Sequence, residues 1–226
     1  MKTLHYIAAS GIMALAAITA KAQDTPAQQY SPSTFHVQRA TLFEVLPVDS
    51  TDIVMLGNSI TNGCEWSELL GRPNIKNRGI SGDITEGVIR RLKPIVDGQP
   101  AKVFLLIGIN DLSRGYTPDS ITARIFRIVD TIKSESPRTQ VYVQSLLPLN
   151  PSFNMFNSHM QHAAEIVPIN ARLANEASGH GYTFIDLYPA FVNAEGLLDP
   201  AYTNDGLHLL GAGYLRWRDI ITPYLD

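Results

Sequence analysis

Short, uninterrupted apolar runs closed by glycine constrain the fold of this chain more than any other feature of its sequence. Residues 53–56 (IVML) stop at Gly57, and residues 103–107 (VFLLI) stop at Gly108. A run of this length without polar residues is typical of a strand that is buried on both faces. The segment over residues 85–96, which lies between them, has helical spacing, so strands and helices alternate along the chain.

The same alternation continues over most of the chain and predicts an α/β protein. Strands are expected over residues 53–56, 74–77, 103–107, 141–147 and 182–187. Helices are expected over residues 35–46, 66–70, 85–96, 118–134, 159–178 and 211–224, with Pro94 shortening or bending the third and Pro168 able to split the fifth. Strands that are separated by helices form a parallel sheet, since the crossovers place helices on both of its faces.

The N-terminus has the pattern of a secretory signal peptide. Lys2 precedes an apolar stretch over residues 7–20, and residues 20–22 (AKA) supply a small-x-small cleavage pattern. The stretch is shorter than the about 20 apolar residues that span a bilayer comfortably. We therefore expect export to the periplasm or the extracellular space, without stable membrane insertion. The expected organisation is a signal peptide, a flexible polar leader and one folded domain, over residues 1–22, 23–34 and 35–226.

Charge and cysteine content narrow the classes of partner and of chemistry. The 226 residues carry 18 Lys/Arg and 21 Asp/Glu, a net charge of −3 at pH 7, and the basic residues form no run. Nucleic acid is therefore not expected as a partner, because nucleic-acid-binding chains usually carry a basic patch. Cys64 is the single cysteine and cannot form an internal disulfide. We interpret it, and Trp66 nearby, as buried core residues.

Residues suited to catalysis follow the ends of four of the five predicted strands. Ser59 follows the first strand, Gly82 the second and Asn110 the third. Asp205 and His208 follow the fifth strand, ahead of the terminal helix. Because the carboxyl ends of parallel strands meet at one edge of the sheet, we expect these residues to lie close together.

Together these residue types can catalyse acyl transfer. A serine hydroxyl becomes a good nucleophile when an imidazole takes its proton, which His208 can do while Asp205 orients its ring. The oxyanion that forms needs hydrogen-bond donors, and the backbone N–H groups of Ser59 and Gly82 and the Asn110 amide could supply three. Glycine at position 82 would let the backbone approach the substrate closely. Each residue alone would be an ordinary turn or capping residue, so only their conjunction indicates catalysis.

These motifs resemble those of the SGNH hydrolases, also called the GDSL esterase/lipase family. The four family blocks carry Ser, Gly, Asn and His, and they occur here in order as GNSIT, NRGISGD, GIND and DGLH within residues 52–214. The most similar branch holds platelet-activating-factor acetylhydrolase subunits and bacterial carbohydrate acetylesterases. The resemblance implies a flavodoxin-like three-layer α/β/α sandwich and ester hydrolysis through an acyl-enzyme, without metal or other cofactor. Asn58 departs from the usual aspartate of the first block, which removes a charge beside the nucleophile. Arg78, in the second block, is expected to position it.

Two further features have both a structural and a functional interpretation. His159, His162 and Glu165 lie on one predicted helix, but their spacing spreads them around it, and the HExxH pattern of zinc proteases is absent. We expect a solvated helix face there and no metal site. The Asn-rich segment over residues 147–158 follows the fourth strand at the catalytic edge, where it either contacts the substrate or only connects two elements.

The predicted function is that of a secreted serine esterase for short-chain acyl esters, with O-acetyl groups on carbohydrates as the favoured substrates. A lipid-directed esterase, such as a lysophospholipase or thioesterase, is the main alternative. A non-catalytic carbohydrate-binding domain or a flavodoxin-like cofactor binder on the same fold is disfavoured, because all four catalytic blocks are intact. A narrow acyl pocket would favour acetyl groups and a long apolar groove would favour lipids, and the sequence distinguishes neither pocket shape nor oligomeric state.

Overall fold

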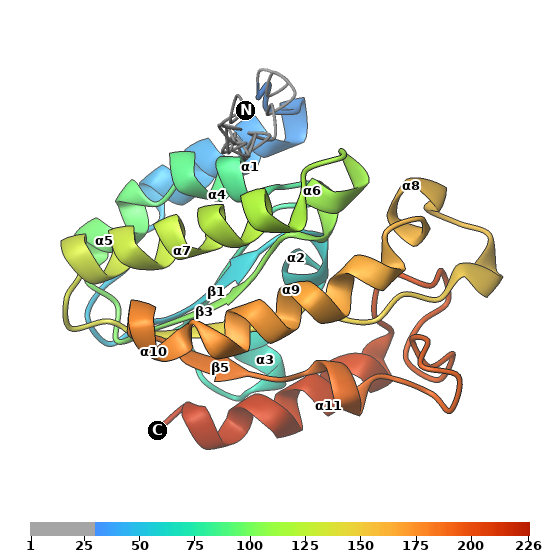
Figure 1. The fold of residues 1–226 in the computed structure, drawn as a ribbon. Coiled ribbons are helices and arrows are strands. Elements are labelled where there is room, and N and C mark those ends of the chain that lie inside the picture. The colour runs from blue at the N-terminus through green and yellow to red at the C-terminus, as the bar shows by residue number, and fades with distance from the viewer. Residues whose placement is uncertain (1–29) are drawn as a thin grey trace, which may run out of the picture. The chain divides into compact units, whose positions relative to one another are not determined.

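A five-stranded parallel sheet forms the middle layer of the protein in the computed structural model, which describes residues 30–226 (Figure 1). The strand order is β2-β1-β3-β4-β5, which is the flavodoxin-like order. The strands are β1 Ile53–Gly57, β2 Ile75–Gly79, β3 Lys102–Leu106, β4 Gln140–Gln144 and β5 Thr183–Ile185. The prediction of a five-stranded parallel α/β sandwich is therefore confirmed.

Helices cover both faces of this sheet (Figure 1). One face carries α4 Thr85–Arg90, α5 Lys93–Gly98, α7 Pro118–Glu135, α9 Ala163–Asn175 and α10 Ala177–His180. The other face carries α3 Trp66–Leu69 and α11 Gly211–Ile221, which meet through edge-to-face contact of Trp66 and Trp217 at 4.8 Å between ring centroids. Helix α1 Thr34–Val45 lies against the end of α4, where the Arg91 guanidinium is 6.0 Å from the centroid of the Phe43 ring. The Ser33 side chain caps α1 by accepting a hydrogen bond from the His36 N–H.

Two of the predicted helices are broken, at different places from those expected. The segment over 85–96 forms α4 and α5, and Pro94 lies in the first turn of α5, where its missing N–H costs nothing. The segment over 159–178 forms α8 Asn157–Met160, α9 and α10, and its breaks flank α9. Pro168 lies inside α9, where burial of Ile166 and Ile169 on either side holds the helix against the core.

Two short helices were not predicted at all, and both follow strand ends. They are α2 Ser59–Asn62 after β1 and α6 Ile109–Ser113 after β3. A helix of four or five residues is too short to display the spacing of apolar residues on which the sequence prediction depends. The structure also contains short 3₁₀ segments at Pro151–Phe153, Tyr188–Ala190 and Thr222–Tyr224.

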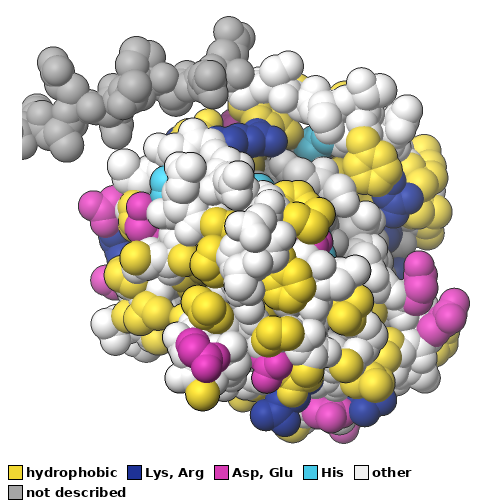
Figure 2. Space-filling view, turned by 90° about the vertical axis from the view of Figure 1, so that its right-hand side faces the viewer, with side chains coloured by type: hydrophobic (Ala, Val, Ile, Leu, Met, Phe, Trp, Pro, Cys, Tyr) yellow, Lys and Arg dark blue, Asp and Glu magenta, His cyan; other side chains and the backbone are white. Residues whose placement is uncertain are grey.

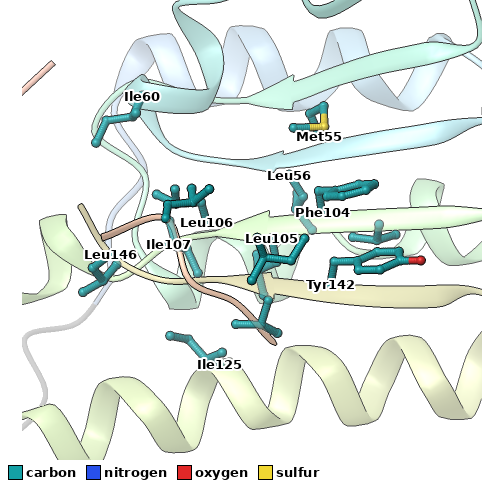
Figure 3. Packing of buried hydrophobic residues seen from close by; sticks show 14 of the residues in the cluster. Met55, Leu56, Ile60, Phe104, Leu105, Leu106, Ile107, Ile125, Tyr142 and Leu146 are labelled. Atoms are coloured by element: carbon teal, nitrogen blue, oxygen red, sulfur yellow. The ribbon is translucent and has the colours of Figure 1, made fainter. Parts of the chain in front are cut away.

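The core lies on both sides of the central strands. Every residue of β1 and β3 is buried, as the unbroken apolar runs predicted. Figure 3 shows Met55, Phe104 and Tyr142 on neighbouring strands, with the rings of Phe104 and Tyr142 stacked at 4.5 Å between centroids. Full burial of a large apolar side chain contributes about 1.5–3 kcal/mol. The strand ends that carry the candidate residues are therefore anchored in the buried core.

Residues 31–226 form one compact unit. No helix in that part of the chain is both long and apolar enough to cross a membrane. The predicted signal peptide and most of the predicted leader lie outside the described residues.

Candidate active site

The carboxyl ends of three adjacent strands carry three of the candidate residues. Gly57 at the end of β1 is paired with the end of β2 on one side and with the end of β3 on the other. Ser59 is the first residue of α2, and Asn110 lies in α6. Gly82 lies in the turn between β2 and α4. The three residues therefore follow neighbouring strand ends, as the sequence predicted.

The structure brings Ser59, His208 and Asp205 together. Ser59 Oγ lies 3.0 Å from His208 Nε2, and His208 Nδ1 lies 2.7 Å from Asp205 Oδ2. Ser59 and His208 are 149 positions apart, so only the folded sheet can join them. This edge of the sheet faces the viewer in Figure 2, where histidine side chains show at the surface among hydrophobic ones. The arrangement has a base in contact with a hydroxyl and a carboxylate in contact with the base.

Asp205 is held ready to act as a charged partner of His208. Its Oδ1 atom accepts hydrogen bonds from the backbone N–H groups of Leu207 and His208, both at 2.8 Å. Burial alone would raise the pKa of the Asp205 carboxyl. These two hydrogen bonds, together with the His208 ring, outweigh that effect and hold the pKa below its ordinary value. The carboxyl is therefore ionised at neutral pH.

The loop that carries Asp205 and His208 packs against the segment after β4. Gly206 accepts a backbone hydrogen bond from Asn150 at 2.9 Å, and its own N–H donates to Thr203 Oγ1 at 3.0 Å. Gly206 has φ of +82°, and a Cβ atom at this position would overlap the Asn150 carbonyl oxygen. Glycine is therefore required for this close approach. The 147–158 segment is thus more than a connector, because it supports the loop of the candidate base.

Asn110 is buried and held from two directions. Its Nδ2 atom donates to the Asp83 carbonyl oxygen at 2.9 Å, and its Oδ1 atom lies 2.9 Å from His159 Nε2. Asp83 directly follows Gly82, so the first contact ties Asn110 to the turn of the second block. Gly82 has φ of +77°, and a Cβ atom there would meet no protein atom within 4 Å. Glycine is therefore favoured at position 82 by its positive φ, and not by neighbouring protein atoms that would exclude a side chain.

A buried ion pair stabilises the turn that contains Gly82. Arg91 Nε lies 2.8 Å from Asp83 Oδ2, and both side chains are almost fully buried. The same guanidinium donates to the backbone carbonyls of Gly57 and Arg78, at 3.0 and 2.8 Å. One side chain therefore links the ends of β1 and β2 to the turn that follows β2. Sequence reasoning did not find Arg91, because no spacing marks its role.

Asn58, the departure from the usual first block, has a structural role. It is fully buried, and its Oδ1 atom accepts a hydrogen bond from the Ile60 N–H at 3.0 Å. This is the contact of an N-cap, which an amide oxygen makes as well as a carboxylate oxygen. The substitution therefore preserves the start of α2 and the position of Ser59.

Sequence reasoning also did not find the contacts of His159 and Phe156 at the site, although Phe156 lies in the 147–158 segment that was considered for substrate contact. His159 was expected on a solvated helix face, but it is half-buried and contacts Asn110. His162 pairs instead with Glu165 at 3.1 Å, and no group of three His, Cys, Asp or Glu residues between 30 and 226 is placed to hold a metal ion. Phe156 packs edge-on against the His208 ring at 5.2 Å. A histidine next to an Asn-rich segment at the catalytic edge was the available signal.

Three other interpreted residues have clear positions. Trp66 and Cys64 are buried, as predicted, and burial raises the pKa of the Cys64 thiol to about 12, which makes it unreactive. The Arg78 guanidinium has one contact within the second block, a hydrogen bond to the Asn77 carbonyl oxygen at 3.1 Å. It donates to the Leu46 carbonyl and lies over the Phe43 ring at 4.9 Å, so it anchors α1. The turn after β2, in the same block, is held by Arg91.

Comparisons with known proteins identify the family of this chain. Residues 55–216 match the GDSL-like Lipase/Acylhydrolase family. The chain is 31% identical over 169 residues to the alpha1 subunit of platelet-activating factor acetylhydrolase IB from Homo sapiens, covering 72% of this chain and 70% of that protein.

Solved structures show the same fold. A GDSL-like lipase from Bacteroides thetaiotaomicron has a TM-score of 0.72 at 25% identity, covering 84% of this chain and 96% of that one. An acetyl-xylooligosaccharide esterase from Geobacillus has a TM-score of 0.58, covers 79% of this chain and 95% of that one, and at 18% identity is evidence of fold alone. The chain therefore belongs to the GDSL-like lipase/acylhydrolase family, the SGNH hydrolases, which are enzymes that act on ester bonds.

Proposed function

We propose that this protein is an exported serine esterase that removes short acyl groups, with acetyl esters of carbohydrates as the favoured substrates. The observation that carries the catalytic part is the position of the His208 ring, 3.0 Å from Ser59 Oγ and 2.7 Å from Asp205 Oδ2. An imidazole held between a hydroxyl and a carboxylate can remove the hydroxyl proton as the oxygen attacks a carbonyl carbon.

The proposed reaction has two half-reactions. Ser59 Oγ attacks the ester carbonyl while His208 Nε2 takes its proton, and His208 then returns that proton to the leaving alcohol as the C–O bond breaks. This leaves the acyl group on Ser59. Water attacks the acyl-enzyme with His208 again accepting the proton, the acid departs, and Ser59 regains its hydrogen. Asp205 keeps the proton of the neutral ring on Nδ1 and stabilises the imidazolium that forms.

The proposed oxyanion hole consists of the backbone N–H groups of Ser59 and Gly82 and the Asn110 side-chain amide. Its support is the placement of these residues after adjacent strand ends, and the hydrogen bond from Asn110 to the backbone of Asp83. An amide nitrogen has two N–H groups. One is used by Asp83, which leaves the other for the substrate oxygen. Loss of one such donor typically lowers kcat about 10²- to 10³-fold.

The acetyl preference is supported by the name of a relative. The 31% identical human protein is called an acetylhydrolase. The choice of a carbohydrate as the alcohol rests on the predicted signal peptide and on the resemblance of the four blocks to those of carbohydrate acetylesterases. Acetyl esters on a lipid are the second candidate. Two exposed apolar side chains, Met155 and Phe156, lie on the segment beside His208 and could contact an alkyl chain.

A matched pair of proteins tests the catalytic part. Wild type should hydrolyse p-nitrophenyl acetate, and Ser59→Ala should lower kcat by about 10⁴- to 10⁶-fold without changing the fold. Circular dichroism and thermal unfolding of both proteins control for folding. If the variant retains wild-type kcat, Ser59 is not the nucleophile.

A substrate panel tests the acyl group and the alcohol separately. The acyl arm compares p-nitrophenyl acetate, butyrate and octanoate, and kcat/KM should be highest for acetate. The alcohol arm compares an acetylated xylo-oligosaccharide with an acetyl glycerolipid presented in micelles. A higher kcat/KM for the glycerolipid would select the lipid alternative, and a higher value for octanoate would overturn the acetyl preference.

Export is tested with the full chain expressed in a Gram-negative host. Mature protein in the periplasm or medium should begin at Gln23 when its N-terminus is sequenced. Protein that keeps Met1 and stays in the cytoplasmic fraction would overturn this part of the proposal.

A further inference from the structure

Two hydrogen bonds determine which way the Asn110 amide faces. The Asp83 carbonyl oxygen can only accept, so the amide nitrogen must face it, at 2.9 Å. The amide oxygen then faces His159 Nε2, also at 2.9 Å. Because an amide oxygen can only accept, His159 must donate, and its proton is on Nε2. The direction of one backbone carbonyl therefore fixes the tautomer of a histidine two contacts away.

His159 has the surroundings of a neutral donor. With the proton on Nε2, the neutral ring carries none on Nδ1, and Nδ1 is buried with no hydrogen-bond partner among residues 30–226. Burial, followed by the nearby His208 and His162, lowers the pKa of His159 below its ordinary value. A protonated ring would bring a buried, unpaired N–H and a charge close to His208.

Phe156 packs against both histidines. Its ring is edge-on to His159 at 5.8 Å and to His208 at 5.2 Å. Its backbone has φ of +53°, which a non-glycine residue adopts only when its surroundings compensate the cost. Helix α8, which follows Phe156 and carries His159, packs against α6, which carries Asn110. The ring of His159 is thus held in place by packing on one side and by a hydrogen bond on the other.

We propose that His159 is the positioning residue of the oxyanion hole. Its Nε2–H holds the Asn110 amide oxygen, so that the second N–H of the amide points toward the carbonyl oxygen of the substrate. This inference rests on the proposed function, since the orientation of Asn110 affects the rate only if Asn110 donates to the oxyanion. Without the His159 bond, the amide keeps one contact, to Asp83, and can turn about its terminal torsion. The oxyanion then meets a donor that must be reoriented in the transition state.

Substitution of His159 should affect turnover more than substrate binding. His159→Phe keeps an aromatic ring but removes the donor. We expect kcat for p-nitrophenyl acetate to fall about ten- to a hundredfold, less than the about 10²- to 10³-fold expected for Asn110→Ala. KM should change by less than about threefold, because the interaction gains strength in the transition state. His159→Gln, whose amide N–H can replace Nε2–H, should restore most of the lost kcat.

The matched control is His162→Phe. His162 lies three positions further along the chain and contacts Glu165 rather than Asn110. Because it does not hold the Asn110 amide, its substitution should leave kcat within about twofold of wild type. Thermal unfolding of each variant separates loss of structure from loss of positioning. If His159→Phe does not fold, His159→Leu takes its place.

A double-mutant cycle decides whether His159 acts through Asn110. In an Asn110→Ala background there is no amide to orient, so adding His159→Phe should cause no further loss of kcat. The inference is overturned if His159→Phe loses the same factor in both backgrounds, or if it retains wild-type kcat in the Asn110 background. Failure of the proposed function has a different signature, which is wild-type activity in Ser59→Ala or in Asn110→Ala itself.

Discussion

The nucleophile side and the acid–base side of the site are supported by different kinds of structure. Ser59 and Asn110 follow the ends of two fully buried strands, β1 and β3. The Arg91–Asp83 ion pair holds the turn after the neighbouring strand, β2. Asp205 and His208 lie on a half-buried loop between β5 and α11, held by short-range hydrogen bonds and by the backbone hydrogen bond from Asn150 to Gly206. Substitution of the buried residues that support Ser59 and Asn110 should therefore lower the stability of the whole domain. Substitution in the loop of Asp205 and His208 should lower activity and leave the fold intact.

The largest expected effect is on the loop side, in Asp205→Asn. Asparagine can still accept the two backbone hydrogen bonds, but it lacks the charge that stabilises the His208 imidazolium. We expect kcat to fall about 10⁴-fold, with the free energy of unfolding changed by less than about 1 kcal/mol. Steady-state kinetics and urea unfolding check both parts. A loss smaller than tenfold would contradict the role of Asp205.

The pH dependence of this carboxylate has a definite sign. Its folded pKa is below the ordinary value, so its contribution to stability is fully present above the unfolded pKa. That contribution is lost only as the pH falls through the lowered, folded pKa. Protonation of Asp205 should therefore not account for any loss of wild-type activity just below neutral pH.

The next effect is on the sheet side, in Arg91→Met. The substitution leaves the buried Asp83 carboxylate without this partner and two strand-end carbonyls without this donor. We expect the free energy of unfolding to fall by about 3–5 kcal/mol. The matched control is Arg90→Met, next in the chain. Arg90 pairs with Glu86 on an exposed face, and its loss should cost at most about 1 kcal/mol. Equal losses in the two variants would contradict the bracing role of Arg91.

A third test returns to the loop, in Gly206→Ala. A methyl group there would overlap the Asn150 carbonyl oxygen, so the loop must shift and move His208. A displacement of about 1 Å can cost about 10²-fold in kcat. Gly196→Ala is the control, because Gly196 also has positive φ, +77°, but a Cβ atom there meets nothing within 4 Å. Its backbone strain should cost about 1–2 kcal/mol without lowering kcat. If both variants retain wild-type kcat, the close contact between Gly206 and Asn150 does not position His208.

The smallest expected effect concerns Asp111, which is buried beside Asn110. Burial raises the pKa of its carboxyl from 3.8 to about 6, despite hydrogen bonds from Thr85. Between these values the unfolded chain releases a proton that the folded chain retains. The free energy of unfolding should therefore fall as the pH rises from about 4 to 6, by about 2–3 kcal/mol.

Asp111→Asn should lack this decline, since an amide does not titrate. Urea unfolding at pH 4.5 and 7.5 measures it in wild type and variant. Asp119→Asn is the control, because that carboxylate is almost fully exposed. A wild-type stability that declines no more than that of Asp111→Asn over this range would show that Asp111 is ionised in the fold.

The two sides also differ in how well the sequence predicted them. The apolar runs that become β1 and β3 predicted the sheet, and the residues after them placed Ser59 and Asn110, because strand ends are local features. The three-residue spacing of Asp205 and His208 was equally visible. The contact of His159 with Asn110 and the backbone contact of Gly206 with Asn150 were not predicted. Both join segments that are distant in the chain and carry no periodic signal.

The most direct test of the account is to identify the residue that becomes covalently modified. Diethyl p-nitrophenyl phosphate transfers its phosphoryl group to an activated serine and forms a stable adduct. We predict that peptide mass spectrometry will find one diethylphosphoryl group, on Ser59, at an occupancy that rises in step with the loss of esterase activity. His208→Ala should slow the labelling greatly. Complete inactivation with Ser59 unmodified, or labelling of Ser59 at the wild-type rate in His208→Ala, would contradict the proposal that His208 activates Ser59.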